Sequence, residues 1–298
     1  MSLVFRPARA DDLPRTDTLV VDSINDLTER YNFGRMATPS PPHFQSFSLK
    51  DDPDGLWIAE EADQILGFAF SWTSEDFWFL AQLFVAPGQQ GRGIGQELLQ
   101  RTLNHARTSG AVNKALITFT FNPVSQGLYI RHGLFPRFPI YFFSASRSDL
   151  TRLPAAPLTW LPLVESQPHL QHLAAIDARA LGFSRAKHHR FLINDERTSG
   201  ALLCAGDDPI GYAYVSRDGH IGPLAVSDRG ALESALNTAM AMVIDSDATK
   251  ISAFLPGTAD RALSMAVNSG MRITFPMVLM ANGDLDWTRY LPRNPGFM

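Results

Sequence analysis

Cysteine and surplus positive charge are both scarce in this sequence. Cys204 is its single cysteine, so the chain can form no internal disulfide and no thiol-rich metal site. Lysine and arginine together number 26 against 30 aspartates and glutamates, a formal net charge of −4. Proteins that bind along a nucleic acid need basic side chains to neutralise its phosphates. Nucleic acid is therefore not an expected partner, and the cytoplasm is the natural compartment for so few thiols.

Long apolar segments and metal-binding patterns are missing as well. Residues 77–85 form a long apolar run, but Gln82 interrupts it and Pro87 stops it, far short of the roughly 20 residues that a membrane span needs. The first residues do not open a signal peptide, so we expect no membrane partner. No metal is expected either, because no metal-ligand spacing joins the histidines at 105, 132, 188 and 189.

The composition is that of a globular protein, and the length suggests two domains. Hydrophobic residues make up 45% of the 298 residues and charged residues 19%, which argues against disorder. The first predicted elements of each half have the same order: a strand, a helix and a two-stranded hairpin. They are expected at residues 3–5, 11–30, 56–59 and 65–70, and again at residues 158–163, 170–181, 201–205 and 210–215.

Each half then continues with a strand, a helix and a further strand, and closes with a last helix and strand. These middle elements are expected at residues 77–86, 94–108 and 115–121, and again at 221–226, 231–244 and 251–255. Alternating strands and helices predict two α/β domains that share one topology. We place the first domain at residues 1–145, a linker of small residues and prolines at 146–157, and the second domain at 158–298.

A glycine-rich turn between a strand and a helix is the strongest signal in the chain. Residues 90–95 read Gln-Gly-Arg-Gly-Ile-Gly and follow a strand that Pro87 ends. Glycines let the backbone turn tightly and approach a ligand, and the free N–H groups of a helix start favour a diphosphate. The plain alternative is a glycine-rich turn without a ligand. A dinucleotide fingerprint and a P-loop both fail, because Gly95 comes one residue early and is followed by glutamine.

This turn resembles the GNAT superfamily of N-acetyltransferases, whose pattern is Gln/Arg-x-x-Gly-x-Gly/Ala after a central strand. The resemblance covers about the first 145 residues in the order of elements and the second half in outline. It implies a central mixed, mostly antiparallel sheet flanked by helices in each of two tandem domains. It also implies acetyl-coenzyme A as co-substrate. The implied cofactor-binding residues are Leu83, Val85, Gln90, Gly91, Arg92, Gly93, Ile94, Gly95, Gln96 and Asn122.

A second segment of the first half carries a candidate for the chemistry. Asn122 suits a helix N-cap, Pro123 a first helical position and Gly133 a helix end. By itself the segment is only a well-capped helix with Tyr129 on its packed face. After the glycine turn, it resembles the second GNAT signature, although Leu134 replaces the usual aromatic residue. The resemblance implies that Tyr129 lies near the coenzyme sulfur, so we expect it to be the general acid.

The proton acceptor for the amine is harder to identify. An alkylamine with a pKa of about 10.4 is almost entirely protonated at neutral pH, so the nucleophile must lose a proton. Many family members have a carboxylate on the central strand, where this chain has Gln82. Glu75 and Asp76 stand at the start of that strand and could act directly or through water. Exposed turn residues are the simpler interpretation of both.

The second half lacks both signatures. Its counterpart of the glycine turn reads Ser-Asp-Arg-Gly-Ala at residues 227–231, with Asp228 where a diphosphate would lie, which is unfavourable. Aligning Gly270 with Gly133 places Ala266 at the position of Tyr129. We therefore expect a degenerate GNAT-like domain that stabilises the first. Its basic segment at 185–190 is expected to be a solvated helix face.

These features together predict an acyltransferase. We expect it to transfer an acetyl group from acetyl-coenzyme A to a primary amine of a small molecule or peptide, by direct attack in a ternary complex. The alternative is a non-catalytic acyl-coenzyme A sensor or scaffold, which the missing strand carboxylate supports. The acceptor, the acyl chain and the oligomeric state stay open, a homodimer included.

Overall fold

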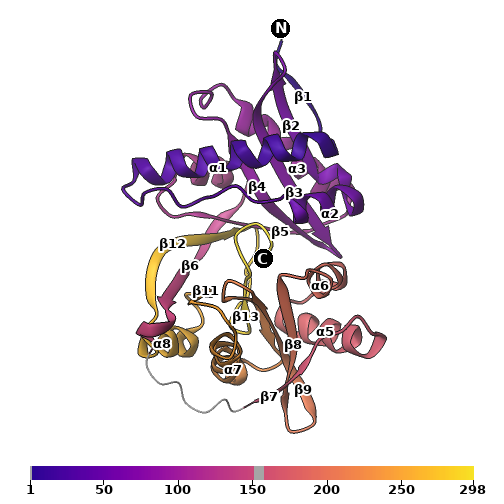
Figure 1. Ribbon diagram of the computed structural model, residues 1–298. Helices are drawn as coiled ribbons and strands as arrows, with labels where there is room; N and C mark the ends of the chain where they lie inside the picture. Colours follow the sequence, from indigo (N-terminus) through magenta and orange to yellow (C-terminus); the bar gives the residue numbers. More distant parts are fainter. Residues whose placement is uncertain (1, 151–157) are drawn as a thin grey trace. The chain divides into compact units, whose positions relative to one another are not determined.

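The computed structural model describes residues 2–150 and 158–298, which divide into two compact units (Figure 1). The first unit comprises Met1–Phe135 together with Ala281–Gly283, and the second comprises Pro136–Met280 and Asp284–Met298. Both are mixed α/β structures, as the sequence predicts. Most of the predicted linker, residues 151–157, lies outside the described residues. Its first residues end a strand and form the short 3-10 helix Arg147–Asp149.

The first unit has a five-stranded sheet in the order β1-β2-β3-β4-β5. All neighbouring strands are antiparallel except β4 and β5, which are parallel. Its helices are α1 (Leu13–Arg30), α2 (His43–Asp51), α3 (Ile94–Thr108) and α4 (Pro123–Arg131). Its strands are β1 (Val4–Pro7), β2 (Leu56–Glu61), β3 (Gln64–Ser74), β4 (Phe77–Val85) and β5 (Asn113–Phe119). Short 3-10 helices at Ala10–Asp12 and Pro53–Gly55 precede α1 and β2.

Helices cover both faces of this first sheet, because β3 is apolar on both sides. Successive side chains of a strand point to opposite faces. Ala69 packs with Leu98 of α3 in one buried cluster, whereas the ring of Phe70 contacts Phe44 of α2 at 5.4 Å between centroids. Helix α2, which the sequence analysis does not predict, therefore covers the face opposite α3.

A buried polar chain supports the first unit on the α3 face. His105 of α3 lies 3.0 Å from the hydroxyl of Ser71 through Nδ1 and 2.9 Å from the carboxylate of Asp52 through Nε2. Ser71 is completely buried, so these contacts satisfy polar groups that have lost water. They join the segment before β2 to β3 and α3.

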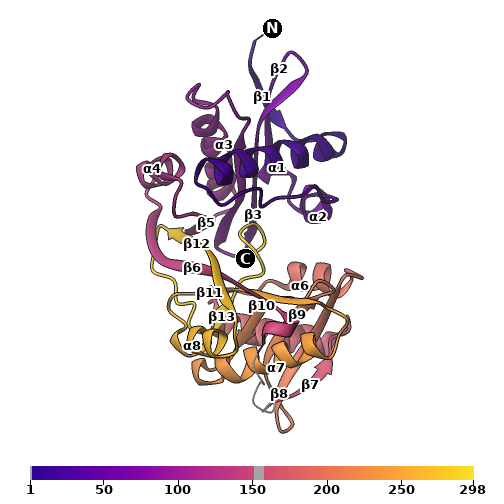
Figure 2. The same ribbon diagram turned by 60° about the vertical axis from the view of Figure 1, so that its left-hand side comes forward.

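The second unit has a longer sheet, in the order β12-β6-β11-β10-β9-β8-β7, with β13 paired to β10 (Figure 2). Strands β10 and β11 are parallel, and β6 pairs with β11 in the antiparallel direction. The strands are β6 (Phe135–Ser146), β7 (Thr159–Pro162), β8 (Thr198–Ala205), β9 (Asp208–Ser216), β10 (His220–Val226), β11 (Lys250–Pro256), β12 (Arg272–Ala281) and β13 (Tyr290–Leu291). The helices are α5 (Gln167–Ala180), α6 (Ala186–Ile193), α7 (Leu232–Ile244) and α8 (Asp260–Asn268), with a 3-10 turn at Arg229–Ala231 before α7.

Most of strand β6 lies in the first domain predicted from the sequence but in the second compact unit of the structure. The sequence assigns residues up to 145 to the first domain, whereas the compact units divide between Phe135 and Pro136. The physical reason is the ladder that β6 forms with β11, from Ile140 opposite Pro256 to Ser146 opposite Lys250. Conversely, Asn282 is grouped with the first unit, where its backbone N–H donates to the carbonyl of Lys114 at 3.1 Å.

No helix in residues 2–150 or 158–298 has both the length and the apolar composition required to cross a membrane.

Candidate functional site

The turn between β4 and α3 has a backbone that only glycine adopts easily. Gly91 and Gly93 have φ angles of +83° and +80°, in the left-handed region. Gly93 is also the N-cap of α3. A Cβ built on either glycine would meet no atom within 4 Å, so the reason for glycine is the backbone angle and not crowding within the protein. The turn therefore leaves open space beside its peptide groups.

The peptide N–H groups of this turn have no partners in the part of the chain that the structure describes. Gln89 N–H donates to the carbonyl of Ala86 at 3.0 Å, and the next backbone donor is Glu97, which bonds to Gly93 at 3.1 Å. Between them, the N–H groups of residues 90–96 donate to no acceptor among residues 2–150 and 158–298. The side chain of Arg92 lies elsewhere, 3.1 Å from the Glu61 carboxylate. The turn is thus not filled by its own side chains.

Strands β4 and β5 separate on the side of the turn. Their parallel pairing runs only from Phe77 opposite Asn113 to Leu80 opposite Leu116, and the register of β4 with β3 shifts at the same level. The Ala86 N–H donates to the carbonyl of Leu66 in β3. Along an antiparallel pair, the peptide groups of successive residues point alternately toward and away from the partner strand. The peptide groups of residues 83 and 85 therefore face the side that β5 has left.

Helix α4 closes the other side of this opening. The side-chain oxygen of Asn122 accepts a hydrogen bond from the Ser125 N–H at 3.2 Å, which confirms the predicted N-cap, and Pro123 opens the helix. Gly133, with φ of +77°, follows its end. Burial raises the pKa of Tyr129 above its usual value near 10. Its hydroxyl forms no hydrogen bond with any residue in the described ranges, and the raised pKa keeps it protonated at neutral pH.

The turn, the end of β4 and the start of α4 together line one cavity of about 240 Å³. Tyr129 and nine of the ten cofactor-binding residues inferred from the sequence lie in its wall, and Arg92 does not. The lining residues that the sequence analysis missed are Gln89, Val124, Ser125, Leu128 and Arg131. Helical spacing could have found Ser125, because it lies four residues before Tyr129 and hence on the same face of α4.

The electrostatic character of this cavity favours an anion. Its lining residues include no aspartate or glutamate. They include Arg131, which is exposed and forms no ion pair with other residues that the structure describes. The N-terminus of α3 adds a partial positive charge. The cavity therefore combines unpaired backbone donors with net positive potential.

The two candidate proton acceptors lie far from the cavity. Glu75 and Asp76 form the turn between β3 and β4, where the Asp76 carboxylate accepts a hydrogen bond from the Asn113 side chain at 2.9 Å. Asp76 lies seven positions before Leu83 along the strand, a span of about 23 Å at about 3.3 Å per residue. Neither carboxylate can act directly at the cavity. Gln82 instead accepts a hydrogen bond from Gln45 of α2 at 3.3 Å.

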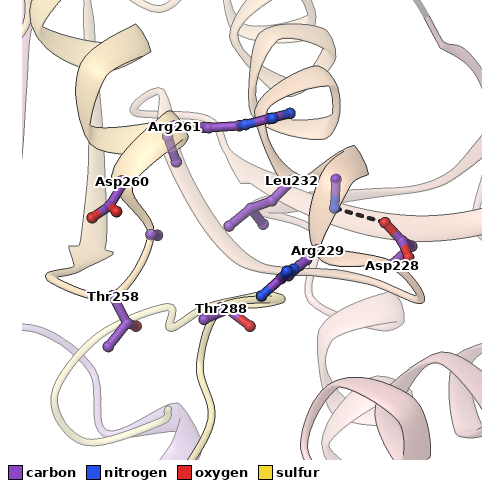
Figure 3. Close-up of a pocket in the computed structure, with 10 residues that line it drawn as sticks. Asp228, Arg229, Leu232, Thr258, Asp260, Arg261 and Thr288 are labelled. Atoms are coloured by element: carbon purple, nitrogen blue, oxygen red, sulfur yellow. Dashed lines mark hydrogen bonds between the residues drawn. The ribbon is translucent and has the colours of Figure 1, made fainter.

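The second unit contains a counterpart of this cavity, at the starts of α7 and α8 (Figure 3). The hollow has a volume of about 350 Å³. Here the turn after β10 bonds to itself, because the Asp228 carboxylate accepts the Gly230 N–H at 2.7 Å. Its lining carries two arginines, Arg229 and Arg261, against two aspartates, Asp228 and Asp260. The positive and negative charges balance, and the Gly230 N–H already has an acceptor. This hollow is therefore a poorer anion site than the cavity of the first unit.

A buried ionic cluster replaces the solvated helix face predicted at residues 185–190, and that prediction is wrong. Arg185 and His189 are each 1% exposed. The guanidinium of Arg185 pairs with Asp177 of α5 at 3.4 Å, and His189 Nε2 lies 2.9 Å from the same carboxylate. Tyr212 donates to Asp177 at 2.6 Å. These partners come from α5 and β9, so the composition of residues 185–190 alone does not reveal that the charges are compensated.

Comparison with known proteins agrees with this geometry. Residues 21–134 match the model of the Acetyltransferase (GNAT) family. A candidate acetyltransferase from Pyrococcus horikoshii is 19% identical, with a TM-score of 0.76, and the match covers 99% of this chain and 96% of that one. A GCN5-related N-acetyltransferase from Sphaerobacter thermophilus is 16% identical, with a TM-score of 0.65 and coverage of 96% of each chain. A tandem GNAT protein from the clavulanic acid biosynthesis pathway is 16% identical, with a TM-score of 0.58 and coverage of 96% of this chain and 100% of that chain.

Proposed function

We propose that this chain is an N-acetyltransferase that transfers an acetyl group from acetyl-coenzyme A to a primary amine, because residues 21–134 match the Acetyltransferase (GNAT) family. The transfer is direct, with both substrates bound at once. One observation carries the proposal. The seven N–H groups of residues 90–96 lack acceptors in the described ranges, and the cavity that they border also contains the side chain of Tyr129.

The residues at the cavity suit the parts of the coenzyme. The backbone of residues 90–96 would hold the diphosphate, since a helix N-terminus with free N–H groups binds phosphate oxygens. Arg131 adds a cation at the same wall. The peptide N–H groups of Leu83 and Val85, which β5 does not pair, would bind the pantetheine arm and the acetyl carbonyl, whereas the Val85 carbonyl already accepts a hydrogen bond from the Ser23 hydroxyl at 3.3 Å. Arg92 is not assigned to the coenzyme, because Glu61 holds its side chain.

Tyr129 is the residue that we assign to the chemistry. When bound, acetyl-coenzyme A supplies an activated thioester. A thiol has a pKa near 8.5, whereas burial raises the pKa of Tyr129 above its usual 10, so complete transfer of its proton to sulfur is uphill. The phenol therefore acts by donating a hydrogen bond to the departing sulfur. No aspartate or glutamate lines this cavity, so we assign no proton acceptor for the amine among its residues.

The Tyr129→Phe variant tests this assignment. Turnover with acetyl-coenzyme A and an amine, followed by thiol release, should fall by about 100-fold or more, the usual size for loss of one hydrogen-bond donor to a developing negative charge. Calorimetry should give an unchanged dissociation constant for coenzyme A, and the melting temperature should not change, because the hydroxyl has no hydrogen bond to lose. Undiminished turnover would remove Tyr129 from the mechanism. Coenzyme A binding with no product from any amine would instead favour an acyl-coenzyme A sensor.

A further inference from the structure

Four aromatic side chains of the first unit form a partly exposed surface near the cavity, here called the aromatic wall: Tyr31, Phe33, Phe119 and Phe121. Phe33 stacks on Phe121 with 4.6 Å between centroids and an interplanar angle of 20°. Tyr31 and Phe119 contact the same ring at 5.2 Å and 4.9 Å. Tyr31 and Phe33 nevertheless remain 41% and 40% exposed. Ring surface is therefore held in place and left open to solvent.

Buried polar side chains of α1 fix the loop that carries two of these rings. Asn25 is 1% exposed; its oxygen accepts the N–H groups of residues 36 and 37 at 2.9 Å, and its amide donates to the carbonyl of residue 37 at 3.0 Å. Thr28, also buried, donates to the carbonyl of Gly34 at 2.6 Å. The loop is thus pre-organised, and ordering the rings on binding would cost little conformational entropy.

The aromatic wall lies across the opened strands from the cofactor cavity. Thr118 of β5 contacts Ser125 of α4 at 3.3 Å, so its side chain is on the cavity side of the sheet. Phe119, the next residue, points to the opposite face. An amine resting on the wall would approach through the gap where β4 and β5 separate, on the side opposite the turn that binds the diphosphate. The turn after β5 joins the aromatic wall to the cavity, because Phe121 directly precedes Asn122 of the cavity lining.

The charges around the aromatic wall argue against a polycationic acceptor. Recognition of a polyamine or aminoglycoside requires free carboxylates close to its several ammonium groups. The two carboxylates of α1 nearest in sequence to Tyr31, Asp26 and Glu29, already pair with Arg30 and Arg35 at 2.9 Å and 3.8 Å. Aromatic faces, by contrast, bind planar apolar groups by stacking and a single ammonium by cation–π attraction.

We propose that the acceptor is an arylalkylamine, a monoamine whose chain carries an aromatic ring that stacks on Tyr31 and Phe33. This inference rests on the proposed acetyl transfer and specifies the substrate class of the same site. The ring contacts position the amine, and neither side chain takes part in bond making. Their removal should therefore raise the KM for the amine and leave the reaction of small amines intact.

The test compares phenethylamine, propylamine and spermidine as acceptors, with acetyl-coenzyme A and thiol release as the readout. Phenethylamine should be the best of the three. Phe33→Ala should lower its kcat/KM about tenfold, the worth of one aromatic contact, and change that of propylamine by less than about twofold. Phe33→Tyr, which keeps a ring, should restore the selectivity. Trp160→Ala removes an aromatic residue of the second unit that is 45% exposed, and it should leave all three rates unchanged.

The outcomes separate this inference from the proposed function. Spermidine as the best acceptor, or an equal loss for phenethylamine and propylamine in Phe33→Ala, would overturn the arylalkylamine assignment and leave acetyl transfer standing. If coenzyme A binds but no amine reacts, binding of phenethylamine to the coenzyme-loaded protein is measured by calorimetry, and its absence also overturns the assignment. Failure of coenzyme A itself to bind would reject the proposed function.

Discussion

The turn after β4 in the first unit and the turn after β10 in the second connect a strand to a helix in the same topological position. In the first, the N–H groups of residues 90–96 have no acceptor in the described ranges. In the second, Asp228 accepts the N–H of Gly230 at 2.7 Å and places a carboxylate at the hollow. The contrast teaches that an anion site depends on donors left unsatisfied, and that the fold alone does not create one.

The two units also differ in the residues on one face of the sheet. This face is covered by α1 and α2 in the first unit and by α5 and α6 in the second. Phe68 and Phe70 of β3 are buried apolar residues, and Tyr212 and Tyr214 occupy the matching positions of β9. The tyrosines bond to a fully buried ionic cluster, Tyr212 to Asp177 at 2.6 Å and Tyr214 to His189 at 2.9 Å. The second unit therefore uses its polar groups to satisfy one another, whereas the first leaves its donors for a ligand.

Asp177→Asn should have the largest effect of the changes considered, because it disrupts the buried ionic cluster of the second unit. It removes one charge of a buried pair and leaves Arg185 with hydrogen bonds to Tyr212, Tyr290 and the backbone oxygen of Met298 but without the Asp177 carboxylate, which costs about 3 to 5 kcal/mol in the free energy of unfolding. Urea denaturation followed by tyrosine and tryptophan fluorescence measures the loss. Glu165→Gln is the matched control, because its ion pair with Arg190 at 3.6 Å is about half exposed and contributes at most about 1 kcal/mol. Equal losses in the two variants would show that the cluster is not a stabilising feature.

The same carboxylate predicts a dependence of stability on pH. Burial alone would raise the pKa of Asp177, but Arg185 and His189 outweigh it and hold the pKa below the ordinary value of 3.8. Its stabilisation is therefore complete above about pH 5 and is lost as the pH falls through the depressed pKa. The wild type should lose stability on acidification below pH 4, and Asp177→Asn should lose less. Parallel losses in both proteins would contradict the assignment.

Gly93→Val tests the same comparison in the first unit, by changing the turn that we expect to bind the diphosphate. Valine is strained at φ of +80°, so the turn should change shape and the affinity for coenzyme A should fall about 100-fold. Gly88→Val is the control, since Gly88 has φ of +79° and equally open space but does not line the cavity. Calorimetry with coenzyme A compares the two. Similar affinities for both variants would mean that the turn does not bind the diphosphate.

Asp228→Ala should have the smallest effect. It frees the Gly230 N–H and removes an exposed cap, which lowers the free energy of unfolding by about 1 kcal/mol. Calorimetry should still count one coenzyme A per chain, because Asp260 remains at the hollow. Asp260→Ala, whose carboxylate caps no N–H in the described ranges, should cost less stability. A second coenzyme A bound by Asp228→Ala would show that one carboxylate alone had closed the second site.

Part of the candidate site could be predicted from the sequence because residues close together in the chain determine it. Gly91 and Gly93 occupy left-handed angles, and Asn122 caps the helix that carries Tyr129; a few neighbouring residues determine both features. The aromatic wall could not be found in this way, since Phe33 and Phe121 are 88 positions apart in the numbering and meet only in the folded unit. The burial of Arg185 could not be predicted for a related reason: its partners Asp177, Tyr212 and Tyr290 come from α5, β9 and β13.

The sequence by itself determined the strand–turn–helix passage around residues 90–95, the capped helix with Tyr129 and the repeated order of elements, because turn geometry, capping and periodicity depend on residues within a few positions. Only the tertiary structure decided that β6 pairs with β11, and which charges are buried. Ladder pairing and burial depend on partners distant along the chain, such as Ile140 and Pro256. Neither residue carries a local sign of the other.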